Sequence, residues 1–146
     1  MSAITGFTGQ HAFLHNNTYA PLWYEGVQYA TVTHAYEAQR TRDRQVQFHI
    51  AAADTTMEAR RRAATYTRTN WDRFRLDIMR DVLCQKFAPG SELLTKLNAT
   101  APRQLINECD APMPFWGTNK GKGQNALGVM LMELRTHTAK PRGKRA

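Results

Sequence analysis

Cysteine is scarce in this chain, because only Cys84 and Cys109 occur among its 146 residues. Two cysteines are too few for a disulfide framework, and free thiols are typical of a reducing cytosol. The first ten residues lack the charged start and the apolar run of a signal peptide. The longest apolar run, residues 126–132, is far shorter than the roughly 20 residues that span a bilayer. We therefore expect a cytoplasmic protein without a membrane partner.

Negative charge is also scarce, since 12 acidic residues stand against 20 basic ones and the net charge is +8. This excess favours anionic partners such as phosphates, nucleotides or nucleic acid, although it can also serve solubility alone. Part of it lies in residues 140–146, where four basic residues accompany a proline and a glycine. We expect a disordered basic tail there, behind a single domain of residues 1–139.

Metal-ligand patterns are missing as well. The five histidines are scattered, and neither cysteine stands at zinc-site spacing from them. The sequence therefore predicts no metal site and no cofactor.

Helical periodicity dominates the middle and the end of the chain. Apolar residues repeat at intervals of three and four from Trp71 to Phe87, which predicts a long helix that Pro89-Gly90 ends. Shorter helices are expected from near Thr33, over residues 47–53, after residues 54–56, around residues 93–97 and over residues 125–137. Short strands are expected before residue 33 and at residues 105–106. The pattern predicts a mainly α fold with a small β-sheet, in the α+β class.

The loop of residues 115–125 joins an aromatic pair to a segment that is rich in glycine and lysine and leads into a helix. Glycines let backbone amides approach an anion, and a helix N-terminus favours negative charge. A solvated glycine turn explains the loop alone equally well. Trp71 could similarly offer a stacking surface for a base, although packing into the core is the more common fate of tryptophan.

Motifs along the chain resemble those of the YbiA-like, or NADAR, domain family. The resemblance covers about residues 13–137, and its closing motif is the most specific part. The matching residues are His15-Asn16-Asn17, Tyr29, Val32, His34 to Tyr36, Ala38, Trp71, Met79, Lys86-Phe87, Trp116-Gly117, Gly123, Asn125, Leu127-Gly128 and Leu131 to Arg135.

The resemblance implies a YbiA-like single domain and hydrolysis of N-glycosidic bonds. The substrates it implies are phosphorylated ribosyl or ADP-ribosyl compounds, either a ribosylamino-pyrimidine phosphate of riboflavin synthesis or ADP-ribosylated guanine in nucleic acid. Breaking a C–N bond to ribose builds positive charge at the anomeric carbon, which a carboxylate can stabilise. An aromatic side chain would hold the base, and lysines with backbone amides would hold phosphate.

Two positions depart from the family pattern in ways that affect catalysis. Thr33 stands where the family has a glutamate before the histidine, and Met113 stands where it has an aspartate. We expect Glu37 to substitute, because it lies one helical turn after Thr33, with Asp110 as a second carboxylate; Glu108 is a further candidate. An exposed helix carboxylate is the common alternative for Glu37.

The predicted catalytic residues are thus Glu37, Asp110 and His34. The predicted ligand-binding residues are expected to line one concavity together with His34, and they are Asn16, Trp71, Trp116, Gly117, Lys120, Lys122 and Asn125. Two other functions remain open from the sequence. The chain could be a binding module for nucleotides or ADP-ribose that has lost catalysis, or a nucleic-acid-associated protein recruited by its basic tail.

Overall fold

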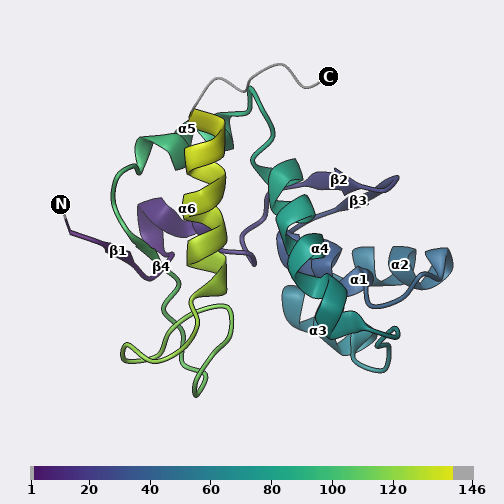
Figure 1. The fold of residues 1–146 in the computed structure, drawn as a ribbon. Coiled ribbons are helices and arrows are strands. Elements are labelled where there is room, and N and C mark those ends of the chain that lie inside the picture. Colours follow the sequence, from purple (N-terminus) through teal and green to yellow (C-terminus); the bar gives the residue numbers. More distant parts are fainter. Residues whose placement is uncertain (1, 140–146) are drawn as a thin grey trace. The chain divides into compact units, whose positions relative to one another are not determined.

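The computed structural model describes residues 2–139, and the predicted tail of residues 140–146 lies outside them. The described residues form two compact units. The central unit comprises Asn16–Lys86, and the terminal unit comprises the segments that precede and follow it. Six α-helices, one 3-10 helix and four short strands make up the described chain, so the predicted α+β class is confirmed (Figure 1).

A β-hairpin and four helices build the central unit. Strands β2 and β3 pair antiparallel, with Trp23 opposite Gln28. The elements of this unit are β2 (Leu22–Tyr24), β3 (Val27–Tyr29), α1 (Val32–Ala38), α2 (Arg44–Ala51), α3 (Thr56–Ala63) and α4 (Trp71–Lys86).

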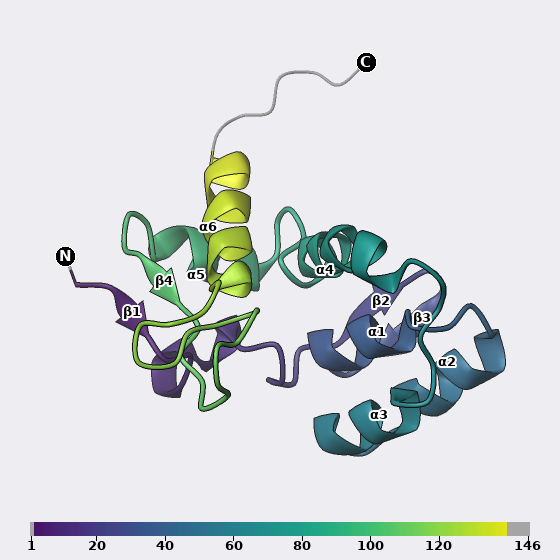
Figure 2. The same cartoon turned by 60° about the horizontal axis from the view of Figure 1, so that its bottom comes forward.

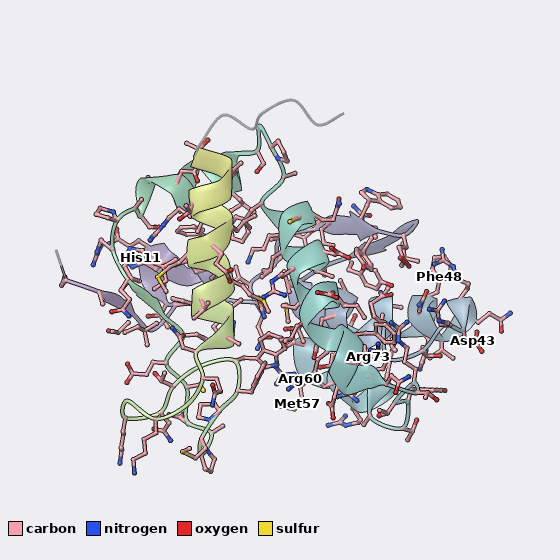
Figure 3. All side chains as sticks on the ribbon, viewed as in Figure 1. His11, Asp43, Phe48, Met57, Arg60 and Arg73 are labelled. Atoms are coloured by element: carbon pink, nitrogen blue, oxygen red, sulfur yellow. The ribbon has the colours of Figure 1, made fainter. Side chains whose placement is uncertain are left out.

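Side-chain caps fix where the short helices of the central unit begin. The hydroxyl of Thr31 accepts from the His34 amide, so the cap of α1 lies two residues before the Thr33 cap that the sequence predicted. Asp43, labelled in Figure 3, accepts from the amides of Gln45 and Val46 and starts α2 at residue 44 rather than 47. Each cap satisfies amides that the helix itself leaves without a partner.

The buried face of α4 follows the predicted period. Ile78, Met79, Val82 and Leu83 are buried along it, and Lys86 is buried at its end. Burial of these apolar side chains stabilises the unit through the hydrophobic effect, at roughly 25 cal/mol per Å² of apolar surface. The burial of a lysine on the same face was not expected from the sequence.

The terminal unit pairs the beginning of the chain with its second half. Strands β1 and β4 run parallel, with Ile4 beside Leu105, so the β-structure forms two separate pairs rather than the single small sheet expected. Figure 2 shows β1 beside β4, and the long loop after β4 lying beneath the start of α6. The elements of this unit are β1 (Ile4–Thr5), the 3-10 helix η1 (Gly9–Leu14), α5 (Glu92–Ala99), β4 (Leu105–Ile106) and α6 (Ala126–Ala139).

The core of the terminal unit is leucine-rich. Leu14, Leu97, Leu105 and Leu131 are completely buried. Within residues 2–139 no helix has both the length and the apolar character needed to cross a membrane.

Candidate functional site

The predicted site residues divide between the two units. Asn16, His34, Glu37 and Trp71 belong to the central unit. The terminal unit carries Asp110, Trp116, Gly117, Lys120, Lys122 and Asn125. Each group has a geometry of its own, and the single concavity that would join them stays a prediction.

His34 is buried in the first turn of α1, and both of its ring nitrogens are hydrogen-bonded. Its Nε2 lies 2.9 Å from the carbonyl oxygen of Ala53, so Nε2 carries the proton and donates. Its Nδ1 lies 2.8 Å from the hydroxyl of Thr31 and accepts from it. The arrangement links α1 to the end of α2, and in this state neither nitrogen is open to a substrate.

Glu37 lies on α1 with an exposed side-chain fraction of only 14%. Its Oε1 is 2.8 Å from Nε of Arg40, which lies in the turn just after the end of α1. The guanidinium of Arg40 also lies 5.4 Å from the ring centroid of Trp71. The structure therefore brings together the carboxylate and the aromatic ring that the sequence singled out separately, and Arg40 joins them.

Trp71 begins α4, and the residue is only 6% exposed. The ring of Tyr36 lies 5.3 Å away at an angle of 51°. Burial raises the pKa of Tyr36 to about 12, and the carboxylate of Glu37 adds to this rise. Trp71 thus packs against Tyr36 and lies beneath the Arg40 guanidinium, so a ligand that stacks on this face must displace Arg40.

Asn16 and Asn17 connect to α1 and α4 of the same unit. The backbone oxygen of Asn16 accepts from the Thr33 amide, and the hydroxyl of Thr33 donates to Oδ1 of Asn17. The amide nitrogen of Asn16 points at the sulfur of Met79, 3.8 Å away. Its Oδ1 is buried without a hydrogen-bond partner among residues 2–139, so it is an acceptor that a ligand donor could use.

Lys86 is a candidate that the sequence reasoning missed, although the motif Lys86-Phe87 had been noted. The side chain is buried, with 4% exposed, and burial lowers the pKa of its amine to about 7. A buried lysine of this kind is often a functional group, because near pH 7 it can either accept or donate a proton. The signal available in the sequence was a lysine in phase with the apolar face of α4.

In the terminal unit, Lys120 and Lys122 lie on a tight hairpin. The amide and carbonyl groups of Asn119 and Lys122 exchange hydrogen bonds of 2.8 and 3.0 Å. Lys120 and Gly121 between them have φ angles of 53° and 79°, the pattern of a type I′ turn. Both lysines are exposed, so they present positive charge at the tip of the loop.

The start of α6 is closed by carbonyl groups of the preceding loop. The amides of Ala126 and Leu127 donate to the carbonyl oxygens of Phe115 and Trp116, each over 3.1 Å. These amides are therefore already satisfied and are not free to bind the anion that the sequence suggested. The positive charge that this loop presents to solvent comes from its exposed lysine side chains.

Asn125 fastens the same loop to strand β4. Its Oδ1 accepts from the Asn107 amide over 2.9 Å, and its Nδ2 donates to the Leu105 carbonyl over 3.0 Å. A Cβ atom on Gly117 would overlap the Asn107 carbonyl oxygen, so only glycine allows this approach. Trp116 is half-buried, and its ring meets that of Phe115 edge-on at 4.9 Å.

The two candidate carboxylates of the terminal unit are more exposed than that of Glu37. Asp110 and Glu108 are both exposed, and so is Met113 in the family's aspartate position. The backbone oxygen of Asp110 accepts from the Asn119 side chain over 3.1 Å. Its carboxylate is therefore placed by a folded loop and faces water.

Known proteins resemble this chain over most of its length. N-glycosidase YbiA of Escherichia coli strain K12 is 33% identical over 123 residues, which are 82% of this chain and 76% of that protein. N-glycosidase Npun_R5314 of Nostoc punctiforme is 32% identical over 114 residues, 73% of this chain and 72% of that one. The riboflavin biosynthesis protein VVA0006 of Vibrio vulnificus is 30% identical over 129 residues, 86% of this chain but 35% of that larger protein.

The fold agrees with these sequence relationships. The NMR structure of the E. coli protein YbiA matches with a TM-score of 0.83 at 30% identity, over 94% of this chain and 85% of that one. Residues 3–138 match the NADAR domain, and the chain belongs to this family. The resemblance noted in the sequence is thereby confirmed.

Proposed function

We propose that this chain is an N-glycosidase that hydrolyses the bond between ribose and nitrogen in a phosphorylated ribosyl or ADP-ribosyl compound. Its membership of the NADAR family and its relatives named N-glycosidases support the activity. The relative named for riboflavin biosynthesis supports a ribosylamino-pyrimidine phosphate as one substrate. ADP-ribosylated guanine is the other candidate, and the lysines of the terminal loop suit the phosphates of either compound.

The observation that carries the proposal is the pairing of Glu37 with Arg40 beside Trp71. In the reaction the C–N bond breaks, the nitrogen leaves with a proton, and the oxygen of water bonds to the anomeric carbon. Positive charge develops on the ribose as the bond stretches. A carboxylate next to the ring that holds the base is well placed to stabilise that charge.

The proposal extends the predicted catalytic set of Glu37, Asp110 and His34 by Lys86. With a pKa of about 7, the Lys86 amine can exchange a proton with water at neutral pH, but it lies at the opposite end of α4 from Trp71. His34 takes a positioning role, because its two hydrogen bonds fix the first turn of α1. Asp110 remains the second candidate carboxylate.

A catalytically impaired nucleotide or ADP-ribose-binding module is the alternative. It is favoured by Thr33, whose hydroxyl is occupied by Asn17 and cannot act as a general base. This alternative predicts binding of ADP-ribose without release of a free base.

Substitution of Glu37 by Gln tests the enzyme against the binding module. The amide keeps the shape of the side chain but cannot stabilise a cation or take a proton, so we expect kcat to fall by ~10²–10⁴. Binding of ADP-ribose, measured by calorimetry, should change little. Chromatography of the released base from both candidate substrates provides the rate.

Glu58→Gln is the matched control for this substitution. Glu58 forms an equivalent i,i+3 ion pair with Arg61 on α3, over 2.7 Å, and it has no predicted role in the site. It should leave the rate unchanged. If the unaltered chain binds ADP-ribose but releases no base over hours, the binding module is correct. If Glu37→Gln retains full activity, Asp110 or Glu108 takes its place.

A further inference from the structure

The face of Trp71 that a base would use is covered in this structure. Arg40 lies over the ring at 5.4 Å, and only 6% of Trp71 is exposed. On the other hand, the Arg40 side chain is 26% exposed. Moving a long, partly exposed arginine side chain away from the Trp71 ring costs much less free energy than moving the buried Tyr36 side chain.

Three anchors hold the Arg40 guanidinium over the ring. Its Nε donates to Glu37 over 2.8 Å, and its Nη1 lies 3.1 Å from the Thr67 hydroxyl and 3.4 Å from the Tyr66 carbonyl oxygen. The Arg40 backbone also accepts from the Arg68 amide over 2.9 Å. The guanidinium therefore has one defined position, and that position joins α1 to the segment leading into α4.

We infer that Arg40 is a positioning residue that occupies the place of the substrate's heterocycle on Trp71 and holds Glu37 until the heterocycle displaces it. A flat, delocalised guanidinium and a heterocyclic base stack on an indole in the same way, so they compete for one surface. When the base replaces Arg40, the ion pair with Glu37 opens and the carboxylate turns to the ribose. Stacking of the base and release of the carboxylate thus become one event.

This inference rests on the proposed function for the roles of Glu37 and Trp71. It predicts that removing the Arg40 side chain strengthens ligand binding, whereas most substitutions in a binding site weaken it. Arg40 reduces affinity in proportion to the fraction of molecules in which it covers the ring. Removing it should therefore strengthen the binding of an uncharged heterocycle. A residue that merely maintains the fold would weaken binding when removed.

The test measures the Kd of guanosine, an uncharged probe, by calorimetry for the full chain and its variants. Arg40→Gln should bind at least about threefold more tightly, because the competing group is gone. The guanosine Kd of Arg40→Lys should lie between those of the unaltered chain and Arg40→Gln, since an ammonium can still pair with Glu37 but cannot lie flat on the ring.

Arg61→Gln is the matched control, because Arg61 makes the same i,i+3 pair with a glutamate but contacts no ring among the described residues. It should leave guanosine affinity unchanged. Thr67→Val keeps the test valid if Arg40→Gln fails to fold, because it removes one anchor of Arg40 and leaves Glu37 and Trp71 intact. It should tighten binding by a smaller factor than Arg40→Gln.

Weaker or unchanged guanosine binding in both Arg40→Gln and Thr67→Val would overturn the inference, and so would equal tightening in Arg61→Gln. These outcomes are distinct from failure of the proposed function. If no substrate is hydrolysed but Arg40→Gln tightens binding, the inference stands for a binding module. If substrate is hydrolysed and Arg40→Gln weakens binding, the enzyme stands without the displacement.

Discussion

At the residue scale, Lys86 differs from most of the other basic residues in a way that the composition does not reveal, because it is buried and its pKa is lowered. It is one of 20 basic residues, and most lysines in proteins lie in water. On α4 it follows Met79 by seven residues, so two helical turns bring it onto the same buried face. Burial lowers its pKa to about 7 because the charged form is poorly solvated there.

This lowered pKa predicts how stability depends on pH. In the folded chain Lys86 loses its proton near pH 7, whereas in the unfolded chain it keeps the proton up to its ordinary value of 10.5. Between these values the unfolded state binds more protons, so this residue makes the free energy of unfolding rise with pH. The rise amounts to at most about 1.4 kcal/mol per pH unit. Urea unfolding from pH 7 to pH 9.5 measures it.

Lys86→Met removes the titrating group while retaining a side chain of similar length. The difference in unfolding free energy between the unaltered chain and Lys86→Met should therefore change with pH over this window. Lys96→Met, at an exposed position of α5, should run parallel to the unaltered chain. Parallel curves for Lys86→Met as well would show that Lys86 is not deprotonated in the fold.

At the scale of elements, the apolar period of α4 was readable from the sequence, whereas the exact caps of α1 and α2 and the long-range hydrogen bonds were not. The apolar period of residues 71–87 predicted α4 because a buried face imposes the repeat of the helix. At the start of α6 the sequence left an anion site and a solvated glycine turn equally open. The amides of this helix start bond to the carbonyls of Phe115 and Trp116, and only the folded loop brings these groups together.

The candidate site likewise combines residues that the sequence could identify with contacts that only the fold creates. The sequence could supply Glu37 and Trp71 as candidates from their chemistry and helical position. It could not show that Arg40 contacts both, because the ring comes from α4 and the carboxylate from α1, 34 residues apart. The hydrogen bond of His34 Nε2 likewise depends on Ala53, which follows the end of α2.

Asn125 provides a test of the element that closes the terminal loop. Its side chain makes two hydrogen bonds to the β4 segment, and its φ of 50° lies in the left-handed region. Asn125→Ala would lose both bonds and place an alanine in that region, which should destabilise the chain by about 2–4 kcal/mol. Thermal unfolding followed by circular dichroism measures the loss.

Gln124→Ala is the control, because Gln124 is the exposed neighbour and its backbone bond to Pro114 does not need the side chain. It should change stability by less than about 0.5 kcal/mol. An Asn125→Ala variant as stable as this control would mean that the loop is held by its backbone bonds alone.

At the scale of the whole molecule, the distribution of basic residues distinguishes binding of a small phosphorylated substrate from binding of a nucleic acid strand. The domain that matches the family ends near residue 138, and four of the basic residues behind the net charge of +8 follow it. A small phosphorylated substrate needs only the local charges of its site. A nucleic acid strand can use every cation within reach, and each contact releases counterions.

Removal of residues 140–146 therefore distinguishes a small-molecule enzyme from one that uses the tail to hold nucleic acid. We expect the chain ending at Ala139 to hydrolyse a ribosylamino-pyrimidine phosphate at an unchanged kcat/KM. Its affinity for a single-stranded oligonucleotide should fall, and the slope of log K against log salt should become shallower by up to about 3, because four cations are lost. A full-length variant with these four residues changed to glutamine should behave like the truncated chain, since charge and not length is responsible. If both variants bind the oligonucleotide with the original affinity and salt slope, the cations that meet nucleic acid lie within residues 1–139, and the tail has no part in recruiting the substrate.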